Sequence, residues 1–393
     1  MNKTLTKLAD GRELIYYDAG PGAVRDAVDA RDLEPVASLA EIRRDPATGD
    51  WVTVAAHRQG RTYHPPADQC PLCPTRAGRL SEIPDAGYDV VVFENRFPSL
   101  GAELPGADAD GPAAGDVLRT AAPGTGRCEV VCFTPDHHSS FADLTPERAG
   151  LVLEAWTDRT AELSALPGVR QVYCFENRGA EIGVTLAHSH GQIYALPFVT
   201  PRTAKMARQA AAHRARTGRN LFEDVLAAEL AGHAEAVAAG DRSADRVVLA
   251  GEHWTAFVPF AARWPYEVHL FPNRRVADFT GLNAAERAEF PHLYLDLLGR
   301  FDRLFTEPGE STQASPTPYI AAWHQAPSPG DVPGGEDGGE DGLDEMALHL
   351  ELFTIRRTAG KLKYLAGVES GMDAFVNDVS PEAAARRLRE VAP

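Results

Sequence analysis

The chain has 393 residues, of which 44% are hydrophobic and 24% are charged, so it can bury one large core or two smaller ones and is not globally disordered. Its 39 basic and 56 acidic residues give a net charge of −17, which argues against a general nucleic-acid-binding surface or an anionic-membrane-binding surface. No apolar run approaches the roughly 20 residues of a membrane-spanning helix, and residues 1–17 lack an apolar signal core, so we expect a cytoplasmic protein. Five cysteines, an odd number, are typical of reduced thiols or a metal site rather than a disulfide framework.

The first half of the chain is predicted to be rich in strands. Residues 1–40 show no clear period and are expected to form an arm or an edge element. Strands are expected over residues 41–44, 51–55, 89–93, 128–133 and 172–175, where β-branched and apolar residues lie between turn residues. A helix is expected from Pro146 to Leu163, with Thr145 as its N-cap. Residues 102–127, rich in Gly, Pro and Ala, are expected to be a mobile insertion.

Helices and strands alternate in the second half. Helices are expected over residues 203–239, 284–305 and 381–391, and strands over residues 247–249, 254–259 and 268–272. Residues 328–345 are rich in Gly, Pro, Asp and Glu and are predicted to be a disordered acidic loop. The sequence His349-Leu350-Glu351 repeats the spacing of His188-Ser189-His190, which indicates that the second half is a degenerate copy of the first.

Two short motifs offer groups for metal or phosphate. Cys70 and Cys73 form a C-x-x-C pair, which is half of a zinc site if further ligands exist and otherwise two unlinked thiols. The loop from His57 to Arg61 is basic in an acidic protein. Its arginines, Arg58 and Arg61, are candidate phosphate ligands, and the alternative is a solvated turn.

Residues 183–195 carry the strongest chemical signal, an H-x-H-x-Q pattern. If the segment is extended, His188, His190 and Gln192 share one face. A neutral imidazole is a competent nucleophile toward phosphorus, and the Gln192 amide can donate to a phosphate oxygen. Gly191 is expected to let a phosphate approach the backbone. The alternative is a half-buried strand with exposed histidines.

Five motifs in order, between residues 70 and 327, give the chain a family resemblance: C-P-L-C, P-D-H, F-E-N-x-G, H-x-H-G-Q-I-Y-A and W-H-x-A-P. With these motifs the sequence resembles the galactose-1-phosphate uridylyltransferase family of the histidine-triad superfamily. The resemblance implies an α+β fold of two histidine-triad-like halves, each a mainly antiparallel sheet with packed helices. Residues 1–200 would hold the active site and a zinc site, and residues 201–393 would form the degenerate half. It also implies a homodimer.

The resemblance implies exchange of UMP between UDP-glucose and galactose 1-phosphate in galactose metabolism, by the Leloir pathway. His190 would form a covalent uridylyl-histidine in a ping-pong mechanism, and Gln192 would steady the uridylyl phosphate. The remaining substrate contacts implied by the resemblance are Arg58, Arg61, Asn95, Asn177 and Thr185, together with Lys363 and Glu369, which would reach the site from the partner subunit. The alternative for Lys363 and Glu369 is an ordinary ion pair on the surface. Ser189 replaces the proline that the family usually has between its two histidines, which makes the backbone beside the nucleophile less stiff.

By the same resemblance, Cys70, Cys73, His137 and His188 are the ligands of a structural zinc ion. His137 is preferred to His138 because it directly follows Pro-Asp. The family's second metal site is matched by His324 and His349, with Glu351 replacing a third histidine. The sequence shows no counterpart of the family's glutamate ligand, so a complete second site is not expected. Two other functions stay open: a related nucleotide phosphorylase or adenylyltransferase, and a catalytically inert, zinc-stabilised binding protein.

Overall fold

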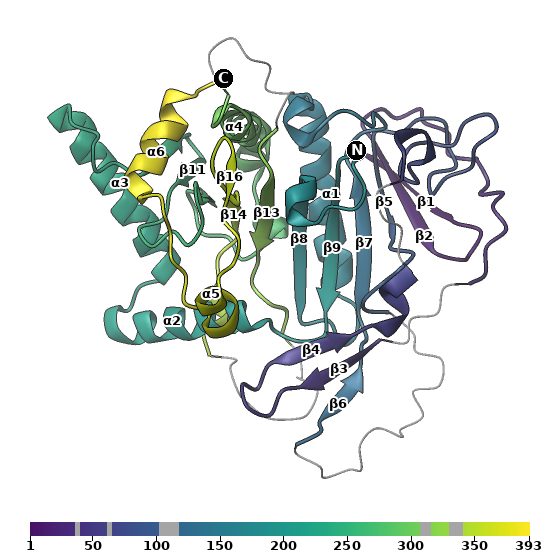
Figure 1. The fold of residues 1–393 in the computed structure, drawn as a ribbon, viewed down its shortest axis with the longest axis horizontal. Coiled ribbons are helices and arrows are strands. Elements are labelled where there is room, and N and C mark those ends of the chain that lie inside the picture. Colours follow the sequence, from purple (N-terminus) through teal and green to yellow (C-terminus); the bar gives the residue numbers. More distant parts are fainter. Residues whose placement is uncertain (36–39, 61–64, 102–117, 307–315, 330–340) are drawn as a thin grey trace.

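A single antiparallel sheet forms the centre of the computed structural model, which describes residues 1–35, 40–60, 65–101, 118–306, 316–329 and 341–393 (Figure 1). The strands of this sheet are β1 (Asn2–Lys7), β2 (Glu13–Asp18), β5 (Val90–Glu94), β7 (Arg127–Cys132), β8 (Gln171–Arg178), β9 (His190–Leu196), β10 (Val247–Ala250), β11 (Trp254–Phe257), β12 (Val268–Pro272), β13 (Tyr319–His324) and β14 (His349–Phe353). They lie in the order β1-β2-β5-β7-β9-β8-β13-β14-β12-β11-β10. A small sheet of β4 (Trp51–Val54), β3 (Glu41–Arg44) and β6 (Ala121–Pro123), and a hairpin of β15 (Arg356–Thr358) and β16 (Lys361–Leu362), complete the strands.

Helices cover both faces of the central sheet. They are α1 (Pro146–Ser164), α2 (Pro201–Thr217), α3 (Leu221–Ala239), α4 (Ala284–Arg303), α5 (Gly367–Met372) and α6 (Pro381–Glu390). The predicted start of α1 is confirmed, because the Thr145 side chain accepts the backbone N–H of Arg148 and Pro146 is the first helical residue. Helices α1 and α4 pack together on one face, while α2 and α3 cover the opposite face of the second half.

The two halves of the sheet repeat one pattern and meet at β8 and β13. Strands β2, β5 and β7 are followed by α1 and then by β8 and β9, and strands β10, β11 and β12 are followed by α4 and then by β13 and β14. The predicted α+β fold is confirmed, but the two predicted sheets are one sheet, because β8 and β13 pair directly. Trp156, Phe279 and Trp323 pack against one another in a core that both halves share. The division into domains at residue 200 stays a prediction.

Three expectations about loops need correction. The first forty residues supply the edge strand β1, as predicted, but also β2, which lies inside the sheet between β1 and β5. Part of the predicted mobile insertion is ordered, since β6 pairs with β3, while residues 102–117 lie outside the described residues. The predicted acidic loop ends earlier than expected, because Leu343 is buried; residues 330–340 of that loop also lie outside the described residues.

Among the helices of the described residues, none combines the length and the apolar character needed to cross a membrane. The expected cytoplasmic location stays a prediction.

Candidate active site and metal centre

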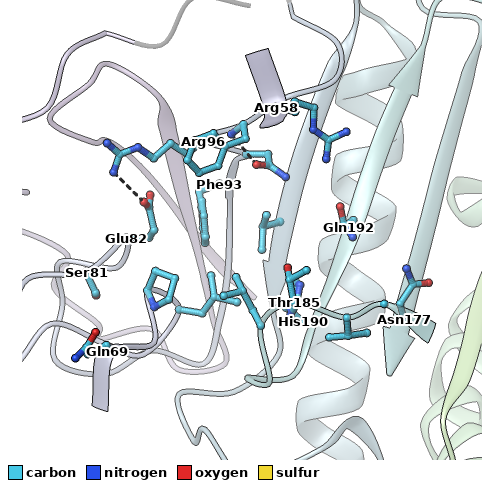
Figure 2. Close-up of a pocket in the computed structure, with 18 of the residues that line it drawn as sticks. Arg58, Gln69, Ser81, Glu82, Phe93, Arg96, Asn177, Thr185, His190 and Gln192 are labelled. Carbon is cyan, nitrogen blue, oxygen red and sulfur yellow. Dashed lines mark hydrogen bonds and ion pairs between the residues drawn. The ribbon is translucent and has the colours of Figure 1, made fainter. Parts of the chain in front are cut away.

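A cavity of about 600 Å³ opens on the face of the first half of the sheet that lies away from α1 and α4 (Figure 2). Its volume is within the usual range for a small-molecule site. The structure brings together in this cavity six residues that the sequence singled out, namely Arg58, Asn95, Asn177, Thr185, His190 and Gln192. Arg61 lies outside the described residues.

The imidazole of His190, the first residue of β9, is oriented by a backbone carbonyl. Its Nδ1 lies 2.7 Å from the carbonyl oxygen of His188. Because a carbonyl oxygen can only accept, Nδ1 carries the proton and Nε2 keeps its lone pair. Burial lowers the pKa of His190, which favours the neutral imidazole. The Ser189 hydroxyl between the two histidines is buried and has no hydrogen-bond partner among the described residues. The structure thus presents an imidazole nitrogen with a free lone pair at the cavity.

Side chains of β9 alternate between the cavity and the core. His190, Gln192 and Tyr194 line the cavity, whereas Ile193 points into the core beneath α1. The expectation that His188 shares this face is wrong, because the strand begins only at His190 and the His188 ring is buried beside Cys73 instead.

Gly191 has a different role from the predicted one. A Cβ atom at this position would lie 2.8 Å from Cζ of Phe133 and 3.1 Å from the carbonyl oxygen of Phe175. Gly191 is buried between these groups on the core side of β9, so it does not provide a phosphate with access to the backbone. Instead, the absence of a side chain lets β9 lie close against Phe133.

One end of the cavity is polar and cationic. Arg58, from the short 3-10 helix Ala56–Gly60, lies on the same side of the cavity as Gln192 and Asn177 (Figure 2). The Asn95 side chain accepts the backbone N–H of Phe97 at 2.9 Å through Oδ1, which leaves its NH₂ group to donate elsewhere. One guanidinium and several amides beside a neutral imidazole suit the binding of a phosphoryl group.

Much of the cavity lining was not predicted from the sequence. The apolar wall of the cavity contains Leu72, Phe93 and Val130, and further polar groups come from Gln69, Ser81, Glu82 and Arg96. Phe93 and Val130 follow the strand alternation, since their neighbours Val92 and Val131 belong to the core beneath α1. That alternation was visible in the sequence, but it does not say what covers the second face of the strand.

Four predicted zinc ligands converge beside the cavity. The ligand atoms of Cys70, Cys73, His137 and His188 all lie within 4.8 Å of one another. Cys73 Sγ lies 3.4 Å from His137 Nδ1 and 3.5 Å from His188 Nδ1. A tetrahedral ion with bonds of about 2.3 Å to sulfur and about 2.0–2.1 Å to nitrogen requires a sulfur–nitrogen edge of about 3.5 Å. The four side chains therefore have the spacing that a zinc ion needs.

The surroundings of these four side chains favour the binding of a cation. His188 Nε2 donates to the carbonyl oxygen of Thr134 at 2.7 Å, which fixes the tautomer that directs Nδ1 toward the cysteines. The Tyr88 hydroxyl donates to the same carbonyl at 2.6 Å. Burial lowers the pKa of His188 to about 4 and raises the pKa of Cys70 to about 11. A neutral imidazole has a nitrogen lone pair available for a metal ion. A buried thiolate is stable only if a positive ion neutralises its negative charge.

Of the two neighbouring histidines, His137 and His138, only His137 belongs to this ligand group among the described residues. His137 offers Nδ1 to Cys73, while the ring of His138 lies edge-on to that of His137 with 5.0 Å between the ring centres and belongs to no such ligand group among the described residues.

A second cluster of potential ligands lies in the other half of the sheet. His324, His349 and Glu351 are brought together, and so are Glu267, His269 and Glu351. Glu267 and His269 were not predicted from the sequence as ligands. The pairing of His269 with Glu351 between β12 and β14 joins the two groups.

Lys363 and Glu369 bind each other. The Lys363 ammonium donates to Glu369 Oε1 and to the carbonyl oxygen of Val376. This hydrogen bond with Lys363, together with backbone donors, lowers the pKa of Glu369 to about 2. Within the described part of the chain, neither residue lines the cavity that contains His190.

The chain is similar to known proteins over most of its length. Family models described as the N-terminal and C-terminal domains of galactose-1-phosphate uridyl transferase match residues 32–200 and 208–393. A galactose-1-phosphate uridylyltransferase of Streptomyces lividans is 55% identical over 394 residues, covering 100% of this chain and 98% of that protein. One from Thermotoga maritima is 35% identical, covering 90% of this chain and 98% of that protein. A solved uridylyltransferase structure superposes with a TM-score of 0.70 at 30% identity, covering 89% of this chain and 98% of the other.

Proposed function

Because the chain belongs to the galactose-1-phosphate uridylyltransferase family, we propose that it exchanges a uridylyl group between UDP-glucose and galactose 1-phosphate through a covalent bond to His190. The observation that carries the proposal is the orientation of His190, whose Nδ1–H is held by the His188 carbonyl so that Nε2 is unprotonated at the cavity. This reaction would place the enzyme in galactose metabolism, in the Leloir pathway.

The reaction proceeds in two displacements. His190 Nε2 attacks the α-phosphorus of UDP-glucose, a phosphorus–nitrogen bond forms, and the bond to the bridging oxygen breaks to release glucose 1-phosphate. The phosphate oxygen of galactose 1-phosphate then attacks the same phosphorus, the phosphorus–nitrogen bond breaks, and UDP-galactose leaves. Because the two sugars use the site in turn, ping-pong kinetics are expected.

Cavity residues support these displacements by binding and orientation. Arg58 balances phosphate charge, and the Gln192 amide donates to a non-bridging oxygen as negative charge develops in the transition state. An amide has no titratable proton to give to a leaving group or to take from water, which favours transfer over hydrolysis. The apolar wall of Leu72, Phe93 and Val130 suits a planar base.

We further propose that Cys70, Cys73, His137 and His188 hold one structural zinc ion. Four protein ligands leave no open position on the ion, so its contribution is to hold the chain in place. His188 would then link the metal centre to the nucleophile, because its side chain binds the ion while its carbonyl oxygen accepts the Nδ1–H of His190.

Isotope exchange tests the proposed function. Radiolabelled glucose 1-phosphate mixed with UDP-glucose and enzyme, without any galactose 1-phosphate, should give labelled UDP-glucose. A parallel reaction with ADP-glucose tests the related adenylyl-transferring function, since exchange with ADP-glucose in preference to UDP-glucose would replace the uridylyl proposal. A protein that exchanges neither would be the inert binding protein.

We expect Gln192→Ala to lower kcat by roughly 10²–10³-fold, because one preorganised donor to the phosphoryl oxygens is lost. Steady-state rates at saturating UDP-glucose and galactose 1-phosphate measure the effect. Gln209→Ala is the matched control, because Gln209 is exposed on α2 and should leave kcat unchanged. Wild-type turnover in Gln192→Ala would remove this residue from the proposed mechanism.

We also propose a homodimer in which Lys363 and Glu369 of one subunit contact the hexose in the other subunit's cavity, which agrees with their absence from the lining of their own cavity among the described residues. Lys363→Met and His190→Gly should each be inactive alone. Refolding the two variants together should restore roughly a quarter of wild-type activity, because half of the dimers are hybrids and each hybrid has one intact site. Activity in a mixture no higher than in either variant alone would show that Lys363 does not act across a subunit interface.

A further inference from the structure

The second cluster of potential ligands contains a positive charge supplied by the chain itself. Arg202, the second residue of α2, donates from Nη2 to Glu351 Oε1 on β14. The two residues are 149 positions apart in the sequence. The Glu351 side chain is only 8% exposed, so this ion pair lies at the border between the core and the start of α2.

The oxygen that binds Arg202 is the oxygen that a metal ion would need. Glu351 Oε1 lies 3.8 Å from Nε2 of both His269 and His349, and Glu351 Oε2 lies 3.4 Å from His324 Nε2. An ion placed among these nitrogens and Oε1 would therefore share its carboxylate ligand with a guanidinium. Two cations on one buried oxygen repel each other strongly, because the interior screens charge poorly.

Arg202 already compensates one of the two carboxylates of the cluster without a metal ion. Two carboxylates, Glu267 and Glu351, face one guanidinium and the imidazole of His269, which lies 3.1 Å from Glu267 Oε1. A divalent ion would leave the cluster with excess positive charge. The residues present therefore do not fit the second metal site that the family resemblance implies.

We propose that the Arg202 guanidinium is the resident cation of the His324–His349–Glu351 cluster, and that it keeps a second metal ion out of this site. In this role Arg202, six residues after the end of β9, ties the beginning of α2 to β14. The same ion pair that excludes the metal thus holds the start of α2 against β14.

Metal titration of the full-length, zinc-loaded protein tests the proposal. Wild type should contain about one zinc ion per chain and should take up no Co²⁺ beyond exchange with that zinc. Arg202→Gln removes the charge and should bind about one additional Co²⁺ per chain, seen as new visible absorption and by metal analysis. Arg202→Lys is the matched control, since it keeps a positive charge and should bind no extra ion. The double variant Arg202→Gln/Glu351→Gln should lose the additional Co²⁺ again.

Two results would overturn the proposal. One is a wild-type protein that takes up a second ion and loses it on Glu351→Gln, because the guanidinium would then fail to exclude metal. The other is a folded Arg202→Gln protein, with its zinc retained, that binds no additional Co²⁺. The wild-type titration does not depend on the folding of any variant, and metal content is measured independently of transferase activity.

Discussion

The His190→Gly protein should form no covalent uridylyl adduct, and its kcat should fall by about 10⁴-fold or more, because the nitrogen that attacks the α-phosphorus is gone. Binding of the nucleotide sugar should change much less, since Arg58, Gln192 and the apolar wall of the cavity remain. Intact-mass measurement after mixing with UDP-glucose detects the adduct directly, and wild type should gain the mass of one uridylyl group.

The control for this experiment is His253→Gly. His253 is partly exposed in the turn before β11 and does not belong to the cavity lining, so its replacement should leave both the adduct and the rate intact. An adduct that persists in His190→Gly would move the nucleophile elsewhere. Loss of the adduct in both variants would instead point to a general loss of folding.

Removing one cysteine of the metal centre should have the second large effect. Cys70→Ala is expected to lose the zinc ion and to lower the free energy of unfolding by about 4–5 kcal/mol or more, as is usual when a structural metal is lost. Activity should fall as well, because the carbonyl oxygen of His188 no longer holds His190 Nδ1 in place. Metal analysis, chemical denaturation and the exchange reaction together measure these three consequences.

Cys174→Ala provides a matched control for the loss of a buried thiol. Cys174 is fully buried on β8 but lies outside the ligand group, so its replacement should cost only about 1 kcal/mol and should leave the zinc content unchanged. Full zinc occupancy in Cys70→Ala would refute the assignment of this site. Equal destabilisation of the two variants would show that the metal adds nothing to stability.

Local sequence signals were enough to predict the long helices, and the family resemblance supplied further residues of the cavity lining. Thr145 and Pro146 mark the start of α1, and Ser380 caps α6 in the same manner. By contrast, the pairing of β8 with β13 joins strands far apart in the sequence and leaves no local pattern, so the single continuous sheet was not predicted.

The parts of the site that were mispredicted depend on neighbours remote in the sequence. Gly191 was assigned to phosphate binding because the sequence does not reveal that Phe133 lies behind it. The orientation of His190 depends on a backbone carbonyl, which no residue type specifies. The role of Arg202 was not predicted because its partner Glu351 lies 149 residues away in the sequence. In each case the tertiary contact, and not the residue type, decides the role.

The pairing of β8 with β13 gives the second half of the chain a structural role that is independent of catalysis. If the first half stood alone, β8 would be a sheet margin with unpaired N–H and C=O groups, open to pairing with other chains and so to aggregation. The second half covers that margin with β13 and shares the aromatic core around Trp323. The second half therefore protects the edge of β8 from pairing with other chains, even though the proposed nucleophile belongs to the first half.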